Sequence, residues 1–110
     1  MSTLTTDDAV FKALADSRRR EILDLLRIER RTTGELCEHF AATLDRCTVM
    51  QHIGVLERAG LLIAAREGRV RWNYLDVAPF QEISERWISP YANAAAGLLM
   101  GLKRGLEAGE

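Results

Sequence analysis

The side-chain pattern changes at Leu61, and this change constrains the fold more than any other feature of the sequence. Before it, apolar residues recur at helical spacing, whereas residues 61–66 and 69–75 have the composition and alternation of two strands. The dipeptide Glu67-Gly68 between them is typical of a hairpin. The second strand has two faces: Val70, Trp72 and Tyr74 on one, and Arg69, Arg71 and Asn73 on the other. We therefore expect a mainly α-helical fold with one small β-hairpin.

Two helices are predicted in the first 31 residues. Thr6 begins the first, because the acidic Asp7 and Asp8 that follow oppose the helix dipole. Asp16-Ser17 interrupts this helix and can cap the second one, which is expected to end near Arg30-Arg31. The inward residues are Val10, Phe11, Leu14 and Ala15 in the first helix, and Ile22, Leu25 and Leu26 in the second, with Leu23 at the margin.

A helix-turn-helix pair is predicted over residues 32–59. Thr32 and Glu35 have the spacing of a capping box, which opens a short third helix with Leu36 and Phe40 inward. Asp45 is a good N-cap for a fourth helix that runs to about Ala59 and ends at the glycine that follows. The inward face of this fourth helix is Val49, Ile53 and Leu56.

A last helical region is expected over residues 77–107. Asp76 caps it, and Pro79 is tolerated in its first turn. Pro90 is expected to bend or break the region, giving helices over about 77–88 and 91–107.

The second of these helices has too little polar surface to be an ordinary surface helix. Residues 94–102 are apolar all round, and a domain of this size has no interior able to surround such a helix. A seam at 4-3-4-3-4 spacing runs along it: Ile88, Ala92, Ala95, Leu99, Leu102 and Leu106. We predict that this seam is the interface of a homodimer, because an exposed apolar patch usually marks an interaction site. The alternative is packing within one chain.

Length and composition favour one intracellular domain spanning residues 1–110, because 47% hydrophobic and 28% charged residues are an ordinary globular balance. Residues 1–8 lack the layout of a signal peptide, and the longest apolar run falls far short of the ~20 residues that span a bilayer. Without an export signal, Cys37 and Cys47 are expected to be reduced thiols. We therefore expect a cytoplasmic protein with no membrane partner.

The distribution of charge, rather than its sum, suggests a nucleic-acid partner. The net charge is −1, so the whole chain does not attract a polyanion. Residues 45–75, however, hold more arginines than acids: Arg46, Arg58, Arg66, Arg69 and Arg71 against Asp45, Glu57 and Glu67. A second cluster, Arg18-Arg19-Arg20, begins the second helix, where a solvated face is the simplest interpretation.

The fourth helix is predicted to lie in the major groove of double-stranded DNA and to read bases with its N-terminal turns. Its outward residues are Arg46, Thr48, Met50, Gln51 and His52. Arginine can grip guanine, glutamine can bond adenine, and Met50 or Thr48 can touch a thymine methyl group. The hairpin then serves as a wing, whose Arg66, Arg69 and Arg71 contact phosphates or the minor groove. For His52, a helix-surface role is the alternative.

Two other classes of function are alternatives to DNA binding. A protein-interaction module can use the same three-helix core and hairpin. An enzyme is not expected, because the chain offers no nucleophile–base grouping, no glycine-rich phosphate loop and no recognisable pair of catalytic carboxylates.

Four segments follow one another in a recognisable order: VFKALADSRRREILDLL (10–26), TTGELCEHF (32–40), MQHIGVLERAGLL (50–62) and REGRVRWNYLD (66–76). Over about residues 9–90 the chain resembles the ArsR/SmtB family of bacterial repressors. The resemblance implies a winged helix-turn-helix homodimer whose first and last helices form the interface. It also implies binding to a palindromic operator, with release when an inducer binds. The helix from Asp45 to Ala59 becomes the recognition helix, and Glu67-Gly68 becomes the wing tip.

The chain departs from the family at several positions. Met50 and Cys47 stand where family members commonly carry serine and proline, so we expect an operator of its own. Cys37 and His39 occupy the two positions of a metal-sensing cysteine pair, but a tetrahedral site needs more ligands. We expect no metal and no cofactor, with Cys37 a small buried apolar residue. No histidine follows His52, which argues against the family's C-terminal metal site.

Cys47 raises a separate hypothesis, because it falls in the first turn of the recognition helix beside Arg46. Oxidation there would put a new group into the DNA interface, although an ordinary surface cysteine is the simpler interpretation. Without a complete metal site, the inducer is left open between a small organic molecule, a partner protein, and none.

Overall fold

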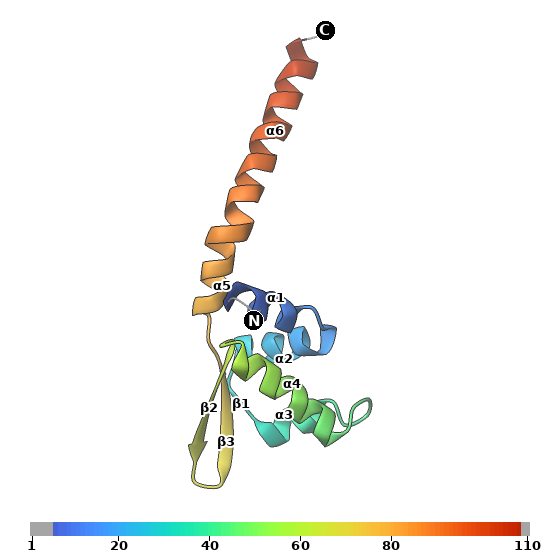
Figure 1. Ribbon diagram of the computed structural model, residues 1–110. Helices are drawn as coiled ribbons and strands as arrows, with labels where there is room; N and C mark the ends of the chain where they lie inside the picture. The colour runs from blue at the N-terminus through green and yellow to red at the C-terminus, as the bar shows by residue number, and fades with distance from the viewer. Residues whose placement is uncertain (1–5, 109–110) are drawn as a thin grey trace, which may run out of the picture. The chain divides into compact units, whose positions relative to one another are not determined.

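A computed structural model describes residues 6–108 of the chain (Figure 1). The contacts divide the chain into two compact units, one ending at Pro79 and the other beginning at Phe80, and each is described by itself. The expectation about a signal peptide concerns residues 1–8, of which residues 1–5 lie outside the described residues. That residues 1–110 form a single domain stays a prediction.

Four helices begin and end close to where the sequence predicts them. They are α1 (Thr6–Leu14), α2 (Ser17–Ile28), α3 (Thr33–His39) and α4 (Arg46–Arg58). Asp16 caps α2 by accepting from the Arg18 N–H at 2.8 Å, and Asp45 caps α4 by accepting from the Thr48 N–H at 2.7 Å. The bond from Thr48 lowers the pKa of the Asp45 carboxyl below its ordinary value. The predicted caps of both helices are confirmed.

The core of the first unit lies between these helices, as the apolar spacing predicts. In α3 and α4 the expected inward residues are all buried: Leu36, Phe40, Val49, Ile53 and Leu56. In α1 and α2 the expectation is partly wrong. Phe11 and Ala15 are exposed and Ala13 is buried instead, while Leu23 is buried and Leu25 lies at the margin. A helix this short has few turns, so a small rotation exchanges neighbouring residues at the edge of its apolar face.

The arginine cluster at the start of α2 has a structural role that the sequence did not reveal. Arg19 donates from Nε to the carbonyl of Ala13 at 2.7 Å and from Nη2 to that of Lys12 at 3.0 Å. Arg20 donates to the carbonyl of Leu14 at 2.6 Å. These carbonyls end α1 and have no partners within that helix. Two members of the cluster therefore cap α1: Arg19 is half-buried there, while Arg20 remains exposed, as the solvated-face interpretation expects.

The end of α4 turns the chain sharply into the sheet. The Gly60 N–H donates to Glu57 and the Leu61 N–H to Leu56, both at 3.0 Å, which is the bonding pattern of a Schellman motif. Gly60 has a φ of 81°, a left-handed conformation that glycine adopts without a steric penalty. The predicted glycine stop is confirmed.

A three-stranded antiparallel sheet holds the hairpin, with strand order β1-β3-β2. The strands are β1 (Arg31–Thr32), β2 (Leu62–Glu67) and β3 (Val70–Leu75). The hairpin is confirmed, and in Figure 1 it extends away from the helices of this unit. Strand β1 was not predicted, since two residues are too few to show alternation. It pairs only with Trp72 and Asn73 of β3.

The hairpin loop lies one residue later than the sequence suggested. Glu67 pairs with Val70 as the last residues of the two strands, so the loop is Gly68 and Arg69 rather than Glu67 and Gly68. Gly68 has a φ of 64°, and no non-glycine residue described has a positive φ. A positive φ at the first loop residue alone fits a type II′ turn, in which glycine takes that position.

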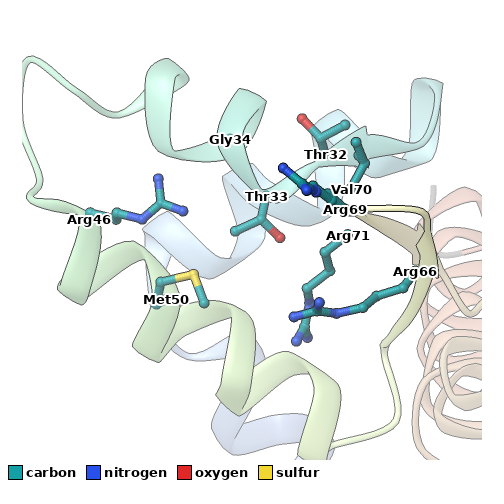
Figure 2. Close-up of a pocket in the computed structure, with 9 residues that line it drawn as sticks. All are labelled: Thr32, Thr33, Gly34, Arg46, Met50, Arg66, Arg69, Val70 and Arg71. Atoms are coloured by element: carbon teal, nitrogen blue, oxygen red, sulfur yellow. The ribbon is translucent and has the colours of Figure 1, made fainter.

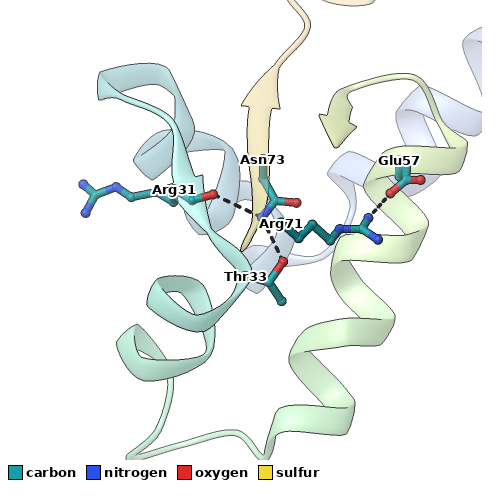
Figure 3. Close-up of polar contacts among 5 residues, drawn as sticks. All are labelled: Arg31, Thr33, Glu57, Arg71 and Asn73. Atoms are coloured by element: carbon teal, nitrogen blue, oxygen red, sulfur yellow. Dashed lines mark hydrogen bonds and ion pairs between the residues drawn. The ribbon is translucent and has the colours of Figure 1, made fainter. Parts of the chain in front are cut away.

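The polar face of β3 is the one that faces the core. Asn73 is completely buried, whereas Val70 on the apolar face is 41% exposed. The strand register agrees with this assignment of the two faces of β3, because Asn73 lies opposite Ala64, and Leu75 lies opposite the buried Leu62. Asn73 Nδ2 donates to the Arg31 carbonyl and to Thr33 Oγ1, each at 3.1 Å (Figure 3). These bonds satisfy the NH2 group of the buried amide, whereas Asn73 Oδ1 is buried without a hydrogen-bond partner among the described residues.

The last helical region consists of α5 (Ala78–Ile83), within which the second unit begins, a π-helical turn η1 (Ser84–Ile88) and α6 (Ser89–Ala108). As predicted, Asp76 caps the region by accepting from the Ala78 N–H at 3.1 Å. The region divides close to the expected place, since the π-helical turn ends at Ile88 and α6 begins at Ser89, with Pro90 in its first turn. The chain does not leave the helical conformation there: the Ser89 N–H bonds to Ser84, five residues back, so the helix widens just before the proline.

We predict that Asn73→Ala lowers the free energy of unfolding by about 1–3 kcal/mol, because the Arg31 carbonyl and the Thr33 hydroxyl lose their buried donor. Urea denaturation measures this change. Asn93→Ala, at an exposed position of α6, is the matched control and should change stability by less than about 0.5 kcal/mol. Equal losses for the two variants would show that the buried amide does not hold the sheet to α3.

Candidate nucleic-acid interface

The outward face of α4 carries the residues that the sequence assigned to base recognition. Arg46, Met50 and Gln51 are exposed, and Thr48 is half-buried in the first turn. Their placement follows from the burial of the opposite face of α4, which faces the core. The N-terminal half of α4 therefore offers a guanidinium, an amide and a thioether to an outside partner.

A cavity of about 470 Å³ lies between α4, the start of α3 and the hairpin (Figure 2). Its lining residues come from three parts of the first unit: Thr32, Thr33 and Gly34; Arg46 and Met50; and Arg66, Arg69, Val70 and Arg71. In Figure 2 the Arg46 side chain extends from the first turn of α4 and the other arginines extend from the hairpin. The recognition helix and the wing thus share one concave surface.

The charge of this surface is strongly positive. Four of its lining side chains are arginines, and no acidic side chain is among the lining residues described. Arg66 and Arg71 are cross-strand partners, so two of these charges lie on the same face of the hairpin. Guanidinium groups present fixed donors that fit phosphate oxygens. The surface is therefore suited to a polyanion.

One of the four arginines already has a partner within the chain. Arg71 forms an ion pair with Glu57 near the end of α4 (Figure 3). Within residues 6–108, the ion pairs include none for Arg46, Arg66 or Arg69. Arg71 therefore connects the wing to the recognition helix, and the other three carry the uncompensated charge.

The remaining predicted residues lie outside this cavity. Thr48, Gln51 and His52 are not among its lining residues. His52 is half-buried, with Nδ1 3.3 Å from Nη1 of Arg19, the residue that caps α1. The structure thus places His52 against α2, and its role in DNA binding stays a prediction.

Sequence reasoning missed the part of the cavity formed by Thr32, Thr33 and Gly34. The capping pattern located the start of α3 correctly, and the Glu35 N–H donates to Thr32 Oγ1 at 3.0 Å. It did not show that β1 brings this start beside β3, because the pairing joins residues 40 positions apart or more. A short polar segment between two helices was the only signal.

The cysteines and His39 lie apart from the cavity lining. Cys37 is half-buried, Cys47 is exposed in the first turn of α4, and His39 Nε2 lies 3.3 Å from Glu21. Among residues 6–108, no group of three or more His, Cys, Asp or Glu side chains has an arrangement that could hold a metal ion. The redox hypothesis for Cys47 stays a prediction.

In the second unit the predicted seam lies on an exposed helix. Its large members, Ile88, Leu99, Leu102 and Leu106, are between 55% and 69% exposed. Ala92 and Ala95 of the same seam are also exposed. Among the described helices, none is long and apolar enough to cross a membrane.

Comparison with known proteins gives consistent matches. A helix-turn-helix domain model matches residues 14–63. The chain is 32% identical over 84 residues to the transcriptional repressor SdpR of Bacillus subtilis, covering 76% of this chain and 90% of that protein. It is 35% identical over 86 residues to YuzN of the same organism, an HTH-type transcriptional regulator, covering 74% and 94%.

Solved structures match the fold as well. The crystal structure of an ArsR family transcriptional regulator is similar with a TM-score of 0.74 and 29% identity, covering 84% of this chain and 98% of that one. HlyU from Vibrio cholerae is similar with a TM-score of 0.62 and 25% identity, covering 79% and 92%. The named relatives are regulators rather than enzymes, and the two solved structures share the fold of this chain. The chain belongs to the ArsR family of winged helix-turn-helix transcriptional regulators.

Proposed function

We propose that this regulator is a repressor that binds a palindromic operator as a homodimer. The observation that carries the proposal is the concave surface in which Arg46 and Met50 of α4 and the arginines of the hairpin line one cavity. A groove-entering helix needs exposed side chains for base edges, and a wing needs cations for the backbone. Both requirements are met on one side of the first unit.

The residues divide between these two tasks by their chemistry. Arg46 and Gln51 can form paired hydrogen bonds with guanine and adenine, while Met50 and Thr48 can contact a thymine methyl group. Arg66 and Arg69 carry uncompensated charge on the hairpin and are assigned to phosphates or the minor groove. Arg71 is assigned a weaker share of this contact, since Glu57 already neutralises it.

The exposed seam of α6 supports the homodimer. Leucines more than 60% exposed on one helix are costly in water, and covering them is favourable by about 25 cal/mol per Å² of apolar surface. A second copy is the simplest cover, because a seam at this spacing is complementary to itself and its alanines allow close approach. Two recognition helices about 34 Å apart would then reach successive major grooves.

Repression is the outcome that the SdpR relationship supports, because that relative is a transcriptional repressor. A dimer bound at a promoter blocks access to the same DNA. We place this activity in the cytoplasm of a bacterial cell, where such a promoter is accessible.

We predict tight binding to the DNA upstream of the protein's own gene, measured by fluorescence anisotropy with unrelated DNA as competitor. Because arginines neutralise phosphates, affinity should fall about a hundredfold between about 50 mM and about 200 mM salt. Binding that the competitor matches at every salt concentration would contradict an operator at this position, and a flat salt response would contradict the assignment of the arginines.

Variants separate base reading from backbone binding. Arg46→Ala and Gln51→Ala should alter which bases are preferred, each costing about 1–3 kcal/mol on the preferred site. Arg69→Ala should weaken binding to all sequences alike, since the loop residue contacts the backbone. Anisotropy titrations on a set of operator variants measure both effects. An altered base preference in Arg69→Ala would show that the wing assignment is wrong.

Charge introduced into the seam should separate the homodimer. Leu99→Glu puts a carboxylate into the predicted interface and should yield monomers in sedimentation equilibrium, with at least about tenfold weaker operator binding. Met100→Glu is the matched control, because Met100 is next to Leu99 and is also exposed but lies off the seam. A Leu99→Glu protein that remains dimeric would refute the assigned interface.

A further inference from the structure

We propose that Arg30 is a positioning residue that holds the wing in place from the face opposite the cavity. This inference rests on the proposed role of the wing arginines in DNA binding. Arg30 lies in the short segment between α2 and β1, and it is not among the cavity-lining residues described. Nothing in the sequence singled it out beyond an expected helix end.

The Arg30 side chain makes three contacts with the hairpin. Its guanidinium carbon lies 3.8 Å from the centre of the Trp72 ring, a close cation–π contact. Nη1 donates to the Tyr74 hydroxyl at 2.9 Å and to Glu67 Oε1 at 3.2 Å. The hydroxyl of Tyr74, together with Glu67, raises the pKa of Arg30 above its ordinary value. One guanidinium thus joins both strands of the hairpin to the segment that follows α2.

These contacts lie on the outer face of the sheet. Residues paired across an antiparallel ladder share a face, so Tyr74 shares one with Ile63, and Trp72 with Ala65. The opposite face carries Asn73, which is buried against the helices, and the cross-strand pair Arg66 and Arg71. Arg30 therefore acts on the hairpin from behind, while the cationic side chains assigned to DNA extend from its front.

The distal half of the hairpin needs such support. Strand β1 pairs only with Trp72 and Asn73, so the ladder beyond them has two strands. A two-stranded ribbon is marginally stable by itself and twists easily. Glu67 lies at the end of β2 next to the loop, so its bond to Arg30 connects the distal end of the hairpin to the segment that follows α2.

The test compares three single variants of the full chain. Arg30→Ala removes the contact and a charge, Trp72→Leu removes the ring and keeps the charge, and Arg27→Ala removes an exposed charge of α2 as the matched control. Hydrogen exchange of peptides covering residues 62–75, measured without DNA, reports the wing directly. We expect faster exchange in Arg30→Ala and Trp72→Leu and no change in Arg27→Ala. Unchanged exchange in Arg30→Ala would overturn the proposal, whether or not the protein binds DNA.

DNA binding then distinguishes positioning from direct contact. Arg30→Ala and Trp72→Leu should each weaken binding about three- to tenfold, and Arg30→Lys, which retains the charge but lacks the fork, should fall between them and the wild type. In the double variant of Arg30→Ala and Arg69→Ala, the loss of DNA affinity should be smaller than the product of the two single losses, since both residues act through one wing. Two results together would refute positioning and show that Arg30 contacts DNA itself. The first is weaker DNA binding in Arg30→Ala but not in Trp72→Leu, and the second is a loss of affinity in the double variant equal to the product of the two single losses.

A wild-type chain that binds no DNA would refute the proposed function and leave the exchange measurement to decide the role of Arg30. Trp72 emission gives a further readout in a Trp87→Phe background, because Trp72 and Trp87 are the two tryptophans of the chain. Removing Arg30 from the ring should make Trp72 more accessible to acrylamide. Unchanged quenching would contradict the cation–π contact.

Discussion

The hydrogen bonds of the buried Asn73 amide hold the DNA-binding half of this protein together. One side chain of β3 bonds to the backbone of β1 and to the first residue of α3. That connection adds to the backbone pairing of β1 with β3. An NH2 group at this place is costly to bury unless it is bonded, so its two hydrogen bonds favour a single position of the sheet. The cavity between wing and recognition helix depends on that position.

Two further contacts constrain the wing from opposite sides. Arg71 pairs with Glu57 of α4 on the inner face, and Arg30 stacks on Trp72 on the outer face. Exposed ion pairs contribute little by themselves, but these two act on the same short ribbon. A wing held from both faces presents its remaining arginines in a defined direction, which reduces the entropy lost when DNA binds.

The arginines explain how a chain with a net charge of −1 suits a polyanionic partner. Some are used inside the fold: Arg19 and Arg20 cap the carbonyls that end α1. Others, such as Arg46 and Arg69, line the cavity without an ion pair among residues 6–108. Local charge, rather than the total, determines the field that a ligand meets at short range, because salt screens more distant charges.

By itself the sequence determined the order of the elements, since capping and periodicity are local: Asp16 and Asp45 begin helices, Gly60 ends one, and a hairpin follows. It also identified the inward face of α4, and hence the outward residues Arg46, Met50 and Gln51. Tertiary structure alone decided what depends on contacts between distant segments. Alternation predicted two faces of β3 but not that polar Asn73 would be buried, because its partners Arg31 and Thr33 lie far away in the chain. The same holds for β1, for the caps supplied by Arg19, and for Arg30 on Trp72. These depend on which segments meet, and no local pattern records that.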